Sequence, residues 1–297
     1  MRVSHASVGV TDAMAVRGDY LMQPLPRFVP GYDFIGTLEH LPRADTSGLV
    51  IGQRVAGILP RMGAHATMIS VASSLLVPVP DALDSATAAT IPLDAVTASF
   101  ALEALSLKHA DTILVQGAGG AVGSWAVQLA ARQGHTVFGT ASSRSRAHAE
   151  SLGAHVLDYR DPTWEERLIA ATGGGVAGAI DHTGSRSVRR AVTGGGRIVH
   201  IAFGGSPGSQ RMRTARGVVA ANLRRCARPA ERVCSIPMSV PLRRAAYREA
   251  LAHALRSVAS GTLTHPKPRL FPLAAYSDAL AAVENTDPGT KVVLAVG

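Results

Sequence analysis

The feature that most constrains this chain is a glycine-rich heptapeptide at residues 117–123, GAGGAVG, which directly follows the apolar run TILVQ. The segment after it, VGSWAVQLAARQ, has a helix-forming composition and ends before Gly134. Glycines at this spacing allow a tight strand-to-helix turn and a close approach of backbone N–H groups to a pyrophosphate. A second predicted strand at residues 136–140 completes the context of a dinucleotide-binding motif. We therefore predict a dinucleotide site that includes Gly117, Gly119, Gly120, Ala121, Val122 and Gly123.

The turn after the second strand predicts which dinucleotide binds. A site that prefers NAD would place Asp or Glu there, about twenty residues beyond the glycines, to accept a hydrogen bond from the ribose 2′-hydroxyl. Residues 141–146 of this chain read ASSRSR and contain no carboxylate. Hydroxyl and guanidinium groups suit a 2′-phosphate, because arginine can bind phosphate bidentately. We therefore predict NADPH, held by Ser142, Ser143, Arg144 and Arg146; the alternative is a polar turn with two solvated arginines.

The order of predicted elements indicates an α/β protein with two domains. Residues 1–90 show short apolar alternations broken by Pro and Gly, which is typical of short strands and turns. From about residue 86 to residue 202, predicted strands alternate with predicted helices, as in a doubly wound parallel sheet. The tail after residue 263 returns to short-strand character. We predict a Rossmann domain over residues 94–263 and a β-rich domain built from residues 1–93 and 264–297.

Positive charge gathers in one stretch of the chain. The whole sequence has 30 basic and 21 acidic residues, a net charge of +9. Between His182 and Ala230 there are ten arginines and no Asp or Glu. Three interpretations stay open: a solvated face, a site for a phosphate-bearing ligand, and a nucleic-acid footprint. The last is the least favoured, because Phe203 is the one aromatic residue there that could stack on a base.

Several classes of protein are excluded by the composition. Two cysteines, Cys226 and Cys234, cannot form a four-thiolate zinc site or a disulfide framework. No apolar run approaches the ~18–20 residues of a membrane span, and the start lacks the apolar core of a signal peptide. We expect a cytoplasmic protein with free thiols, no bound metal and no membrane partner.

Motifs spread over nearly the whole chain carry a resemblance to a known family. They are VGVTDAMAVRGDY, VPGYDFIG, GQRVAG, the TA of PLDAVTASFAL, TILVQGAGGAVGSWAVQLAARQG, TVFGTASSRSR, LGAHVLDYRD, GGRIVHIAFG and SGTLTHPKPRLFPL with DALAAVENTDPGTKVVL. Together they resemble the zinc-independent, zeta-crystallin-like quinone oxidoreductases of the medium-chain dehydrogenase/reductase superfamily. The resemblance implies a GroES-like catalytic domain with a Rossmann domain, NADPH as hydride donor, and a homodimer in which the sheet continues across the interface.

The resemblance also implies roles for individual residues. Tyr159 joins the serines and Arg146 around the adenosine 2′-phosphate, Thr97 lies beside the nicotinamide, and Asp12 and Tyr20 line the substrate cleft. From the residues themselves, positions that end predicted parallel strands are expected near the ligand, because ligands bind at the carboxyl ends of such strands. These positions are His182, Ala202 and Phe203; for His182, a polar residue that merely ends its strand is the alternative.

The expected chemistry relies on hydrogen bonds, because a nicotinamide without a metal must activate its substrate in that way. Reduction of a conjugated C=C bond spreads negative charge over an enolate, so that one or two neutral donors suffice. We therefore predict hydride transfer to a quinone or to the C=C bond of an α,β-unsaturated ketone. The predicted catalytic residues are Tyr20, as hydrogen-bond donor or proton source, with Asp12 and Asp94; Tyr20 as a packing residue and Asp94 as a structural acid stay open.

Departures from the family pattern motivate an alternative. Gly9 stands where an asparagine is common, and Gly31-Tyr32-Asp33 stands where zinc-dependent relatives carry G-H-E, so no metal chemistry is expected. The chain begins roughly thirty residues inside the pattern, which implies either a misassigned start or a barrel with an exposed sheet edge. The alternative function is a nucleotide-binding redox sensor or RNA-binding relative with little turnover, which would use the arginine-rich stretch.

Overall fold

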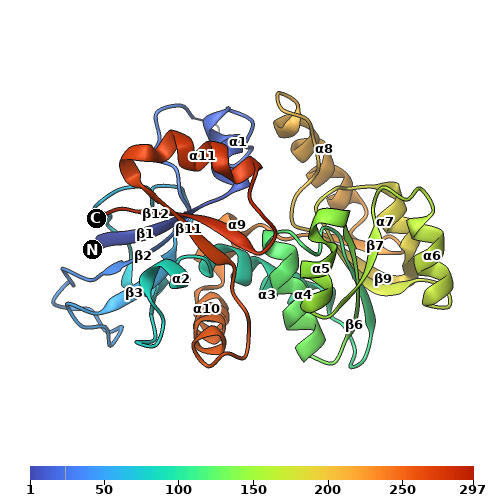
Figure 1. Cartoon of the computed structure of the whole chain (residues 1–297), viewed down its shortest axis with the longest axis horizontal. Coiled ribbons are helices and arrows are strands. Elements are labelled where there is room, and N and C mark those ends of the chain that lie inside the picture. The colour runs from blue at the N-terminus through green and yellow to red at the C-terminus, as the bar shows by residue number, and fades with distance from the viewer. Residues whose placement is uncertain (24) are drawn as a thin grey trace. The chain divides into compact units, whose positions relative to one another are not determined.

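The computed structural model describes residues 1–23 and 25–297, which form two compact units (Figure 1). The first unit comprises Met1–Val96 and Ile236–Gly297, and the second comprises Thr97–Ser235. The second unit therefore ends before residue 263, where the sequence placed the Rossmann boundary. The reason is Tyr247, which is fully buried, donates a hydrogen bond to the carbonyl of Leu75 at 2.9 Å and accepts one from the N–H of Ile58 at 2.8 Å.

The second unit contains a six-stranded parallel sheet with the order β10-β9-β8-β5-β6-β7. Counted along the unit, this is the 3-2-1-4-5-6 order of a doubly wound fold, which confirms the predicted Rossmann sheet. The order reverses between β5 and β8, so the ligand crevice of such a fold lies at the carboxyl ends of these two strands. The strands are β5 (Thr112–Val115), β6 (Thr136–Ala141), β7 (Ala154–Asp158), β8 (Val176–Asp181), β9 (Val192–His200) and β10 (Ala230–Val233).

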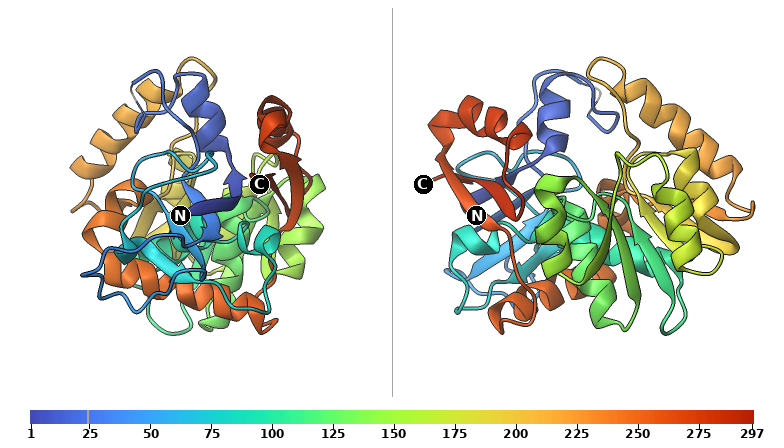
Figure 2. Two further views of the ribbon diagram at one scale, coloured as in Figure 1. Left: turned by 90° about the vertical axis from the view of Figure 1, so that its left-hand side faces the viewer. Right: turned by 45° about the vertical axis from the view of Figure 1, so that its right-hand side comes forward.

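Helices flank this sheet (Figure 2). The central strand β5 is a continuous apolar run because both of its faces are covered, and Ile113, Leu114 and Val115 are fully buried. One face packs against α6 and α7, where Trp164 and Val188 join the core around Leu114. The helices of this unit are α3 (Pro92–Leu105, which begins in the first unit), α4 (Ala121–Arg132), α5 (Ser143–Ser151), α6 (Trp164–Ala171), α7 (Arg186–Ala191) and α8 (Gln210–Leu223).

The first unit contains a six-stranded mixed sheet with the order β11-β12-β1-β2-β3-β4. Within this sheet β11 and β12 pair in parallel, and the other neighbours are antiparallel. The first strand of the chain lies between β12 and β2, so the edges of this sheet are β11 and β4. The strands are β1 (Arg2–Val8), β2 (Asp33–Thr37), β3 (Arg54–Ile58), β4 (Leu76–Pro78), β11 (Lys267–Pro272) and β12 (Thr290–Ala295).

The core of the first unit lies between this sheet and its helices, with Val3, Phe34 and Leu294 at its centre. The segment Ser85–Leu105 is long and apolar enough to cross a membrane, but 72% of its apolar window is buried inside the protein, as in a core helix. The helices are α1 (Val10–Val16), α2 (Ser85–Ala88), α9 (Ile236–Leu242), α10 (Arg244–Ala259) and α11 (Tyr276–Glu284), with short 3₁₀ turns at Ser73–Leu75 and Leu273–Ala275.

Candidate functional site

The glycine turn after β5 has a backbone that only glycines permit at two positions. A Cβ atom at Gly123 would overlap the carbonyl oxygen of Gly117, a backbone atom that cannot move aside. Gly117 has a φ of +72°, and a Cβ there would lie 2.8 Å from the ring of His182. The sequence motif therefore forms the compact strand-to-helix turn that it predicted.

The glycine turn is hydrogen-bonded to β6, and α4 begins directly after it, at the carboxyl edge of the sheet. The N–H of Gly117 donates to Thr140 Oγ1 at 3.0 Å, and the N–H of Ala118 donates to the Thr140 carbonyl at 2.9 Å. Gly120 is the N-cap of α4, so Ala121 and Val122 lie in its first turn. The N–H groups of a first turn have no acceptor within their own helix and point at a ligand with partial positive charge. The arrangement fits a pyrophosphate.

The carboxylate-free turn after β6 lies against the glycine turn. A Cβ at Gly119 would lie 2.6 Å from Ser145 Cβ, so the two turns are in contact. Ser142 is the N-cap of α5, but its hydroxyl makes no capping bond and instead lies 3.1 Å from Ser145 Oγ. Ser143 and Arg144 are exposed at the start of the helix. Two hydroxyls and a helix N-terminus therefore lie beside the glycine turn, where an adenosine ribose would follow the pyrophosphate.

Arg146 makes hydrogen bonds within the protein, and its predicted contact with a 2′-phosphate stays a prediction. It donates to the carbonyl of Val156 in β7 at 2.8 Å and to Glu150 Oε1 at 3.2 Å, so one of its terminal nitrogens already links α5 to the neighbouring strand. Tyr159, just beyond β7, is 48% exposed, and the Arg160 guanidinium lies 5.6 Å from its ring centre. Arg160 is therefore a further cation at this end of the sheet that the sequence analysis did not select.

His182 lies at the point where the strand order reverses. It follows β8 directly, and its Nδ1 lies 3.2 Å from the carbonyl oxygen of Gln116 at the end of β5. Since a carbonyl only accepts, Nδ1 carries the proton, and Nε2 is left for other contacts. The side chain is exposed and covers Gly117, as the prediction of a ligand-adjacent residue requires.

The carboxyl end of β9 carries the remaining predicted residues of this unit. Ala202 is exposed and Phe203 is buried, with its ring stacked on His200 at 4.9 Å between centres. Gln210 at the start of α8 donates a hydrogen bond to the Phe203 carbonyl. Thr97, the first residue of this unit, is buried on α3.

A buried charged network, which the sequence analysis missed, lies beneath Phe203. His200 Nδ1 is 3.2 Å from Asp181 Oδ2, and its Nε2 is 3.0 Å from Glu231 Oε2. Burial alone would lower the pKa of His200, but hydrogen bonds to both carboxylates outweigh burial and raise it. Burial would raise the pKa of Asp181, but its bonds from His200 and Thr183 outweigh burial and lower it. One sequence signal could have indicated this network. Asp181 and His200 are polar residues that end two successive apolar strands.

In the first unit, Tyr20, a predicted catalytic residue, forms a polar pair with Tyr32. The hydroxyl of Tyr32 donates to that of Tyr20 at 3.3 Å, and the rings pack edge to face. Burial raises the pKa of Tyr20 above its ordinary value, and burial likewise raises the pKa of Tyr32. Since the oxygen of Tyr20 accepts from Tyr32, its own proton is free to point toward a ligand. Tyr20 is partly exposed and can therefore act as a neutral donor.

The two predicted carboxylates hold other groups in place. Asp12 is buried, and its oxygens accept from the N–H groups of Gly9 and Gly31, both at 2.8 Å. Asp94 is buried and lies 2.5 Å from Lys291 Nζ. Both carboxylates are buried and hydrogen-bonded to other groups of the first unit, and their roles in catalysis stay predictions. Tyr20 is the predicted catalytic residue whose polar atom remains available.

Lys291 is the centre of this buried cluster, and the sequence analysis did not select it. Burial would lower the pKa of Lys291, but the charges of Asp94 and Asp33 outweigh burial and raise it. Burial raises the pKa of Asp33, whose oxygens accept from Ser7 Oγ at 2.6 Å and from the N–H of Leu93 at 2.9 Å. Within residues 1–23 and 25–297, no group of three or more His, Cys, Asp or Glu side chains has the arrangement of a metal site.

Comparison with known proteins gives matches in both units. Residues 1–81 match the alcohol dehydrogenase GroES-like domain, and residues 121–229 match the zinc-binding dehydrogenase domain. Among solved structures, the quinone oxidoreductase from Thermus thermophilus, also solved in complex with NADPH, superposes with a TM-score of 0.75. It is 27% identical, and the match covers 100% of this chain and 90% of that one.

Curated relatives include reductases and much larger synthases. The chain is 31% identical over 203 residues to a trans-enoyl reductase of Aspergillus niger, which covers 60% of this chain and 55% of that protein. It is 26% identical over 303 residues to a phenolphthiocerol/phthiocerol polyketide synthase of Mycobacterium tuberculosis, which covers 100% of this chain and 13% of that one. The match thus spans about half of the first relative and a small part of the second. Both domain matches, together with the two sheets, show that the chain belongs to the medium-chain dehydrogenase/reductase superfamily.

Proposed function

We propose that this protein is an NADPH-dependent, zinc-free oxidoreductase that reduces a C=C bond conjugated to a carbonyl, in an enone or an enoyl thioester, or a quinone. The observation that carries the proposal is the contact between the glycine turn and the carboxylate-free turn at Ser145. A dinucleotide with its pyrophosphate on the first turn would meet the second turn with its adenosine ribose, where no acid is available to accept from a 2′-hydroxyl.

The residues present fit NADPH. Gly117 to Gly123 would hold the pyrophosphate, and Ser142, Ser143 and Arg144 would hold the 2′-phosphate, with His182 beside the glycine turn. Asp158 lies opposite Ala141 in the sheet, on the neighbouring strand, and its Oδ1 accepts from the N–H of Arg160 at 2.9 Å. When bound, NADPH supplies the hydride.

Tyr20 supports the choice of substrate chemistry. Its raised pKa keeps the hydroxyl protonated over the physiological range, so the residue can donate to a carbonyl oxygen but carries no charge to neutralise an alkoxide. Conjugate reduction needs only such a donor, because the negative charge spreads over the enolate. The trans-enoyl reductase relative and the quinone oxidoreductase neighbour support the two acceptor classes.

Asp33 supports the zinc-free part of the proposal. It occupies the position at which zinc-dependent relatives would carry the glutamate of G-H-E. Both of its oxygens accept hydrogen bonds, from Ser7 and from the N–H of Leu93, and Tyr32 precedes it in place of a histidine. Each oxygen of Asp33 is therefore already engaged in a hydrogen bond within the protein, and the histidine that would complete a zinc ligand set is absent at residue 32.

A panel of acceptors tests the proposal. The purified chain is mixed with NADPH and one of crotonyl-N-acetylcysteamine, cyclohexenone, benzoquinone or the saturated aldehyde butanal, and loss of reduced-nicotinamide absorbance is followed. We expect turnover with at least one conjugated acceptor and none with butanal. Silence across the panel, while NADPH raises the unfolding temperature of the same sample, would overturn the proposal. Treatment with a chelator should leave the rate unchanged.

We further propose that the protein is a cytoplasmic homodimer. The strand β10 pairs only with β9 among the described residues, so its outer edge has free backbone groups that can pair with a second copy. Light scattering after size-exclusion chromatography distinguishes a dimer from the 30.8 kDa monomer.

A further inference from the structure

The arginines between His182 and Ala230 divide into two groups in the structure. Four have side-chain contacts inside the protein: Arg189 and Arg224 with Glu231, Arg190 with Glu165, and Arg197 with two backbone carbonyls of α3. The side chains of the other six make no hydrogen bond or ion pair with any described residue. They are Arg186, Arg211, Arg213, Arg216, Arg225 and Arg228. The fold therefore uses fewer than half of these charges.

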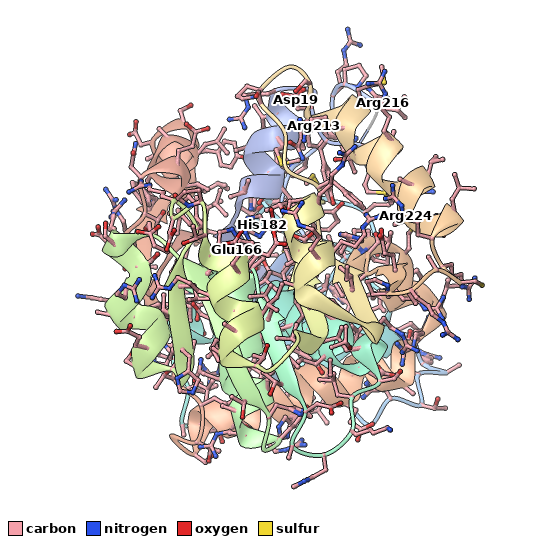
Figure 3. The ribbon with its side chains drawn as sticks, turned by 90° about the vertical axis from the view of Figure 1, so that its right-hand side faces the viewer. Asp19, Glu166, His182, Arg213, Arg216 and Arg224 are labelled. Carbon is pink, nitrogen blue, oxygen red and sulfur yellow. The ribbon has the colours of Figure 1, made fainter. Side chains whose placement is uncertain are left out.

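Half of the unused arginines lie on α8, a helix that exposes apolar side chains. Met212 and Val219 are each 59% exposed, and Leu223 is 83% exposed. Positions seven and four residues apart share one face of a helix, so these three form a single apolar stripe. By the same geometry, Arg213 and Arg216 border one side of the stripe and Arg211 borders the other. We call these six residues the α8 surface; Figure 3 shows Arg213, Arg216 and Arg224 along this helix.

The α8 surface is fixed to the carboxyl end of β9, where the sequence predicts ligand-adjacent residues. A Cβ at Gly217 would overlap the ring of Phe203, so helix and ring are in direct contact. Gln210 Nε2 also donates to the Phe203 carbonyl, which holds the start of α8 to the carboxyl end of β9. Whatever binds the exposed side of α8 is therefore placed next to the edge of the sheet where the substrate is expected.

The apolar and basic residues of the α8 surface indicate what kind of partner it binds. Proteins that bind single-stranded nucleic acid stack its bases on aromatic side chains, and the chain has none between Phe203 and Tyr247. A small phosphate ligand would leave Leu223 uncovered. A second copy seated on this face would bring like charges together across the interface, which is unfavourable. An acidic protein with an apolar contact ridge matches both the stripe and its positive border.

We propose that the α8 surface docks an acidic carrier protein that delivers the unsaturated acyl group as a thioester. This inference rests on the proposed reduction of a conjugated C=C bond. The arginine border accelerates encounter with the acidic carrier, and the apolar stripe provides the contact that remains at higher salt. The carrier seats beside Phe203 and directs its acyl arm toward the carboxyl edge of the sheet.

The test compares the same acyl group with and without a carrier. Wild type and the variant Arg213→Glu/Arg216→Glu are assayed with crotonyl-N-acetylcysteamine, crotonyl-CoA and a crotonylated acidic acyl carrier protein. The control Arg43→Glu/Arg61→Glu makes the same change in net charge with two exposed arginines of the first unit. We expect the α8 variant to lose about tenfold or more in kcat/KM for the carrier substrate alone, through KM, and the control to match wild type. Leu223→Ser should also weaken only the carrier reaction.

Each other outcome has a defined meaning. Equal rates of the α8 variant and wild type with the carrier substrate would overturn the docking proposal. Equal losses with crotonyl-CoA and the carrier would overturn it too, and would assign the arginines to a phosphate. If wild type reduces none of the three substrates, the proposed function fails, and docking is decided by titrating carrier protein against wild type and variant. The docking proposal would be overturned if the charge reversal did not weaken carrier binding. It would also be overturned if single-stranded RNA or anionic vesicles bound more tightly than the carrier.

Discussion

His200 Nε2 lies 3.0 Å from Glu231 Oε2, and the side chains of His200 and Glu231 are only 3% and 2% exposed. Asp181 lies on the other side of the same imidazole, 3.2 Å from Nδ1. This arrangement links three neighbouring strands beneath Phe203. Asp181 and His200 are the last residues of β8 and β9, and Glu231 lies near the start of β10, opposite Ile198. Two buried carboxylates require a positive charge between them, because an uncompensated buried charge is strongly unfavourable. The protonated imidazole, assisted by Arg189 on Glu231, supplies it.

The first prediction concerns the pH dependence of stability. The pKa of His200 is raised in the folded protein, so its contribution is fully present below the ordinary value of 6.5 and is lost as pH rises through the folded pKa. The pKa of Asp181 is lowered, so its contribution is present above 3.8 and is lost as pH falls. Urea unfolding should show greatest stability between these limits. His200→Gln should cost about 3 kcal/mol near neutral pH and remove the alkaline loss.

The control for His200 is His253→Gln, which alters an exposed histidine in α10. It should leave both the free energy of unfolding and its pH dependence unchanged. Partial recovery of stability in the double variant His200→Gln/Glu231→Gln would show that the single variant suffers from an unpaired carboxylate. Identical pH profiles for wild type and His200→Gln would contradict the assigned role.

The second prediction concerns nucleotide choice. Ser142→Asp keeps a good N-cap residue on α5 but places a carboxylate where the 2′-phosphate should bind. NADPH should bind about tenfold to a hundredfold more weakly, because a favourable bond to a charged group, worth about 1.5–3 kcal/mol, becomes a repulsion. NADH should bind no worse. Titration calorimetry with both nucleotides checks this, with Ser142→Asn as the uncharged control; a variant that loses NADPH and NADH equally would contradict it.

The third prediction concerns the glycine turn. Gly123→Ala forces a Cβ against the Gly117 carbonyl, so the turn must open, at a cost of about 1–3 kcal/mol in stability. We also expect loss of the thermal shift with NADPH. Gly195→Ala is the matched control, because a Cβ there meets nothing within 4 Å. Normal NADPH binding by Gly123→Ala would mean that the nucleotide does not lie on this turn.

The fourth prediction concerns Tyr20. Tyr20→Phe removes the donor and should lower kcat about tenfold to a hundredfold with little change in NADPH affinity. Tyr32→Phe should have a smaller effect, because it removes only the bond that orients the Tyr20 hydroxyl. The raised pKa of Tyr20 means that wild type should show no loss of kcat from its ionisation until the pH exceeds the ordinary value of 10. An unchanged kcat in Tyr20→Phe would remove this residue from the chemistry.

The sequence predicted the Rossmann unit well because its signals are local. The run at residues 112–116 is buried on both faces of the sheet, and the turn after it needs glycines at fixed positions, so each feature is visible in a short window. The helix α8 was not predicted, because its exposed face carries Met212, Val219 and Leu223 while its buried face includes small residues. The sequence of α8 therefore lacks the buried apolar stripe from which an amphipathic helix is predicted.

The site could be predicted only in part because several of its contacts join distant residues. Asp12 fits a substrate-binding position in the sequence, but its partner Gly31 lies 19 residues away and takes one oxygen. The ion pair of Asp94 with Lys291 joins residues 197 positions apart, and no local pattern announces it. Arg146 could be placed at the correct turn, but its bond to Val156 depends on the pairing of β6 with β7.

The transfer of hydride from NADPH to the substrate can be followed with a deuterium label. The full chain is incubated with NADPH deuterated at the transferring carbon and with crotonyl-N-acetylcysteamine, and the product is analysed by mass spectrometry and NMR. The account predicts a saturated thioester with one deuterium on its β-carbon, formed by wild type and strongly reduced in Tyr20→Phe. Deuterium on the carbonyl carbon of an alcohol product, or no transfer to any conjugated acceptor although NADPH binds, would contradict it.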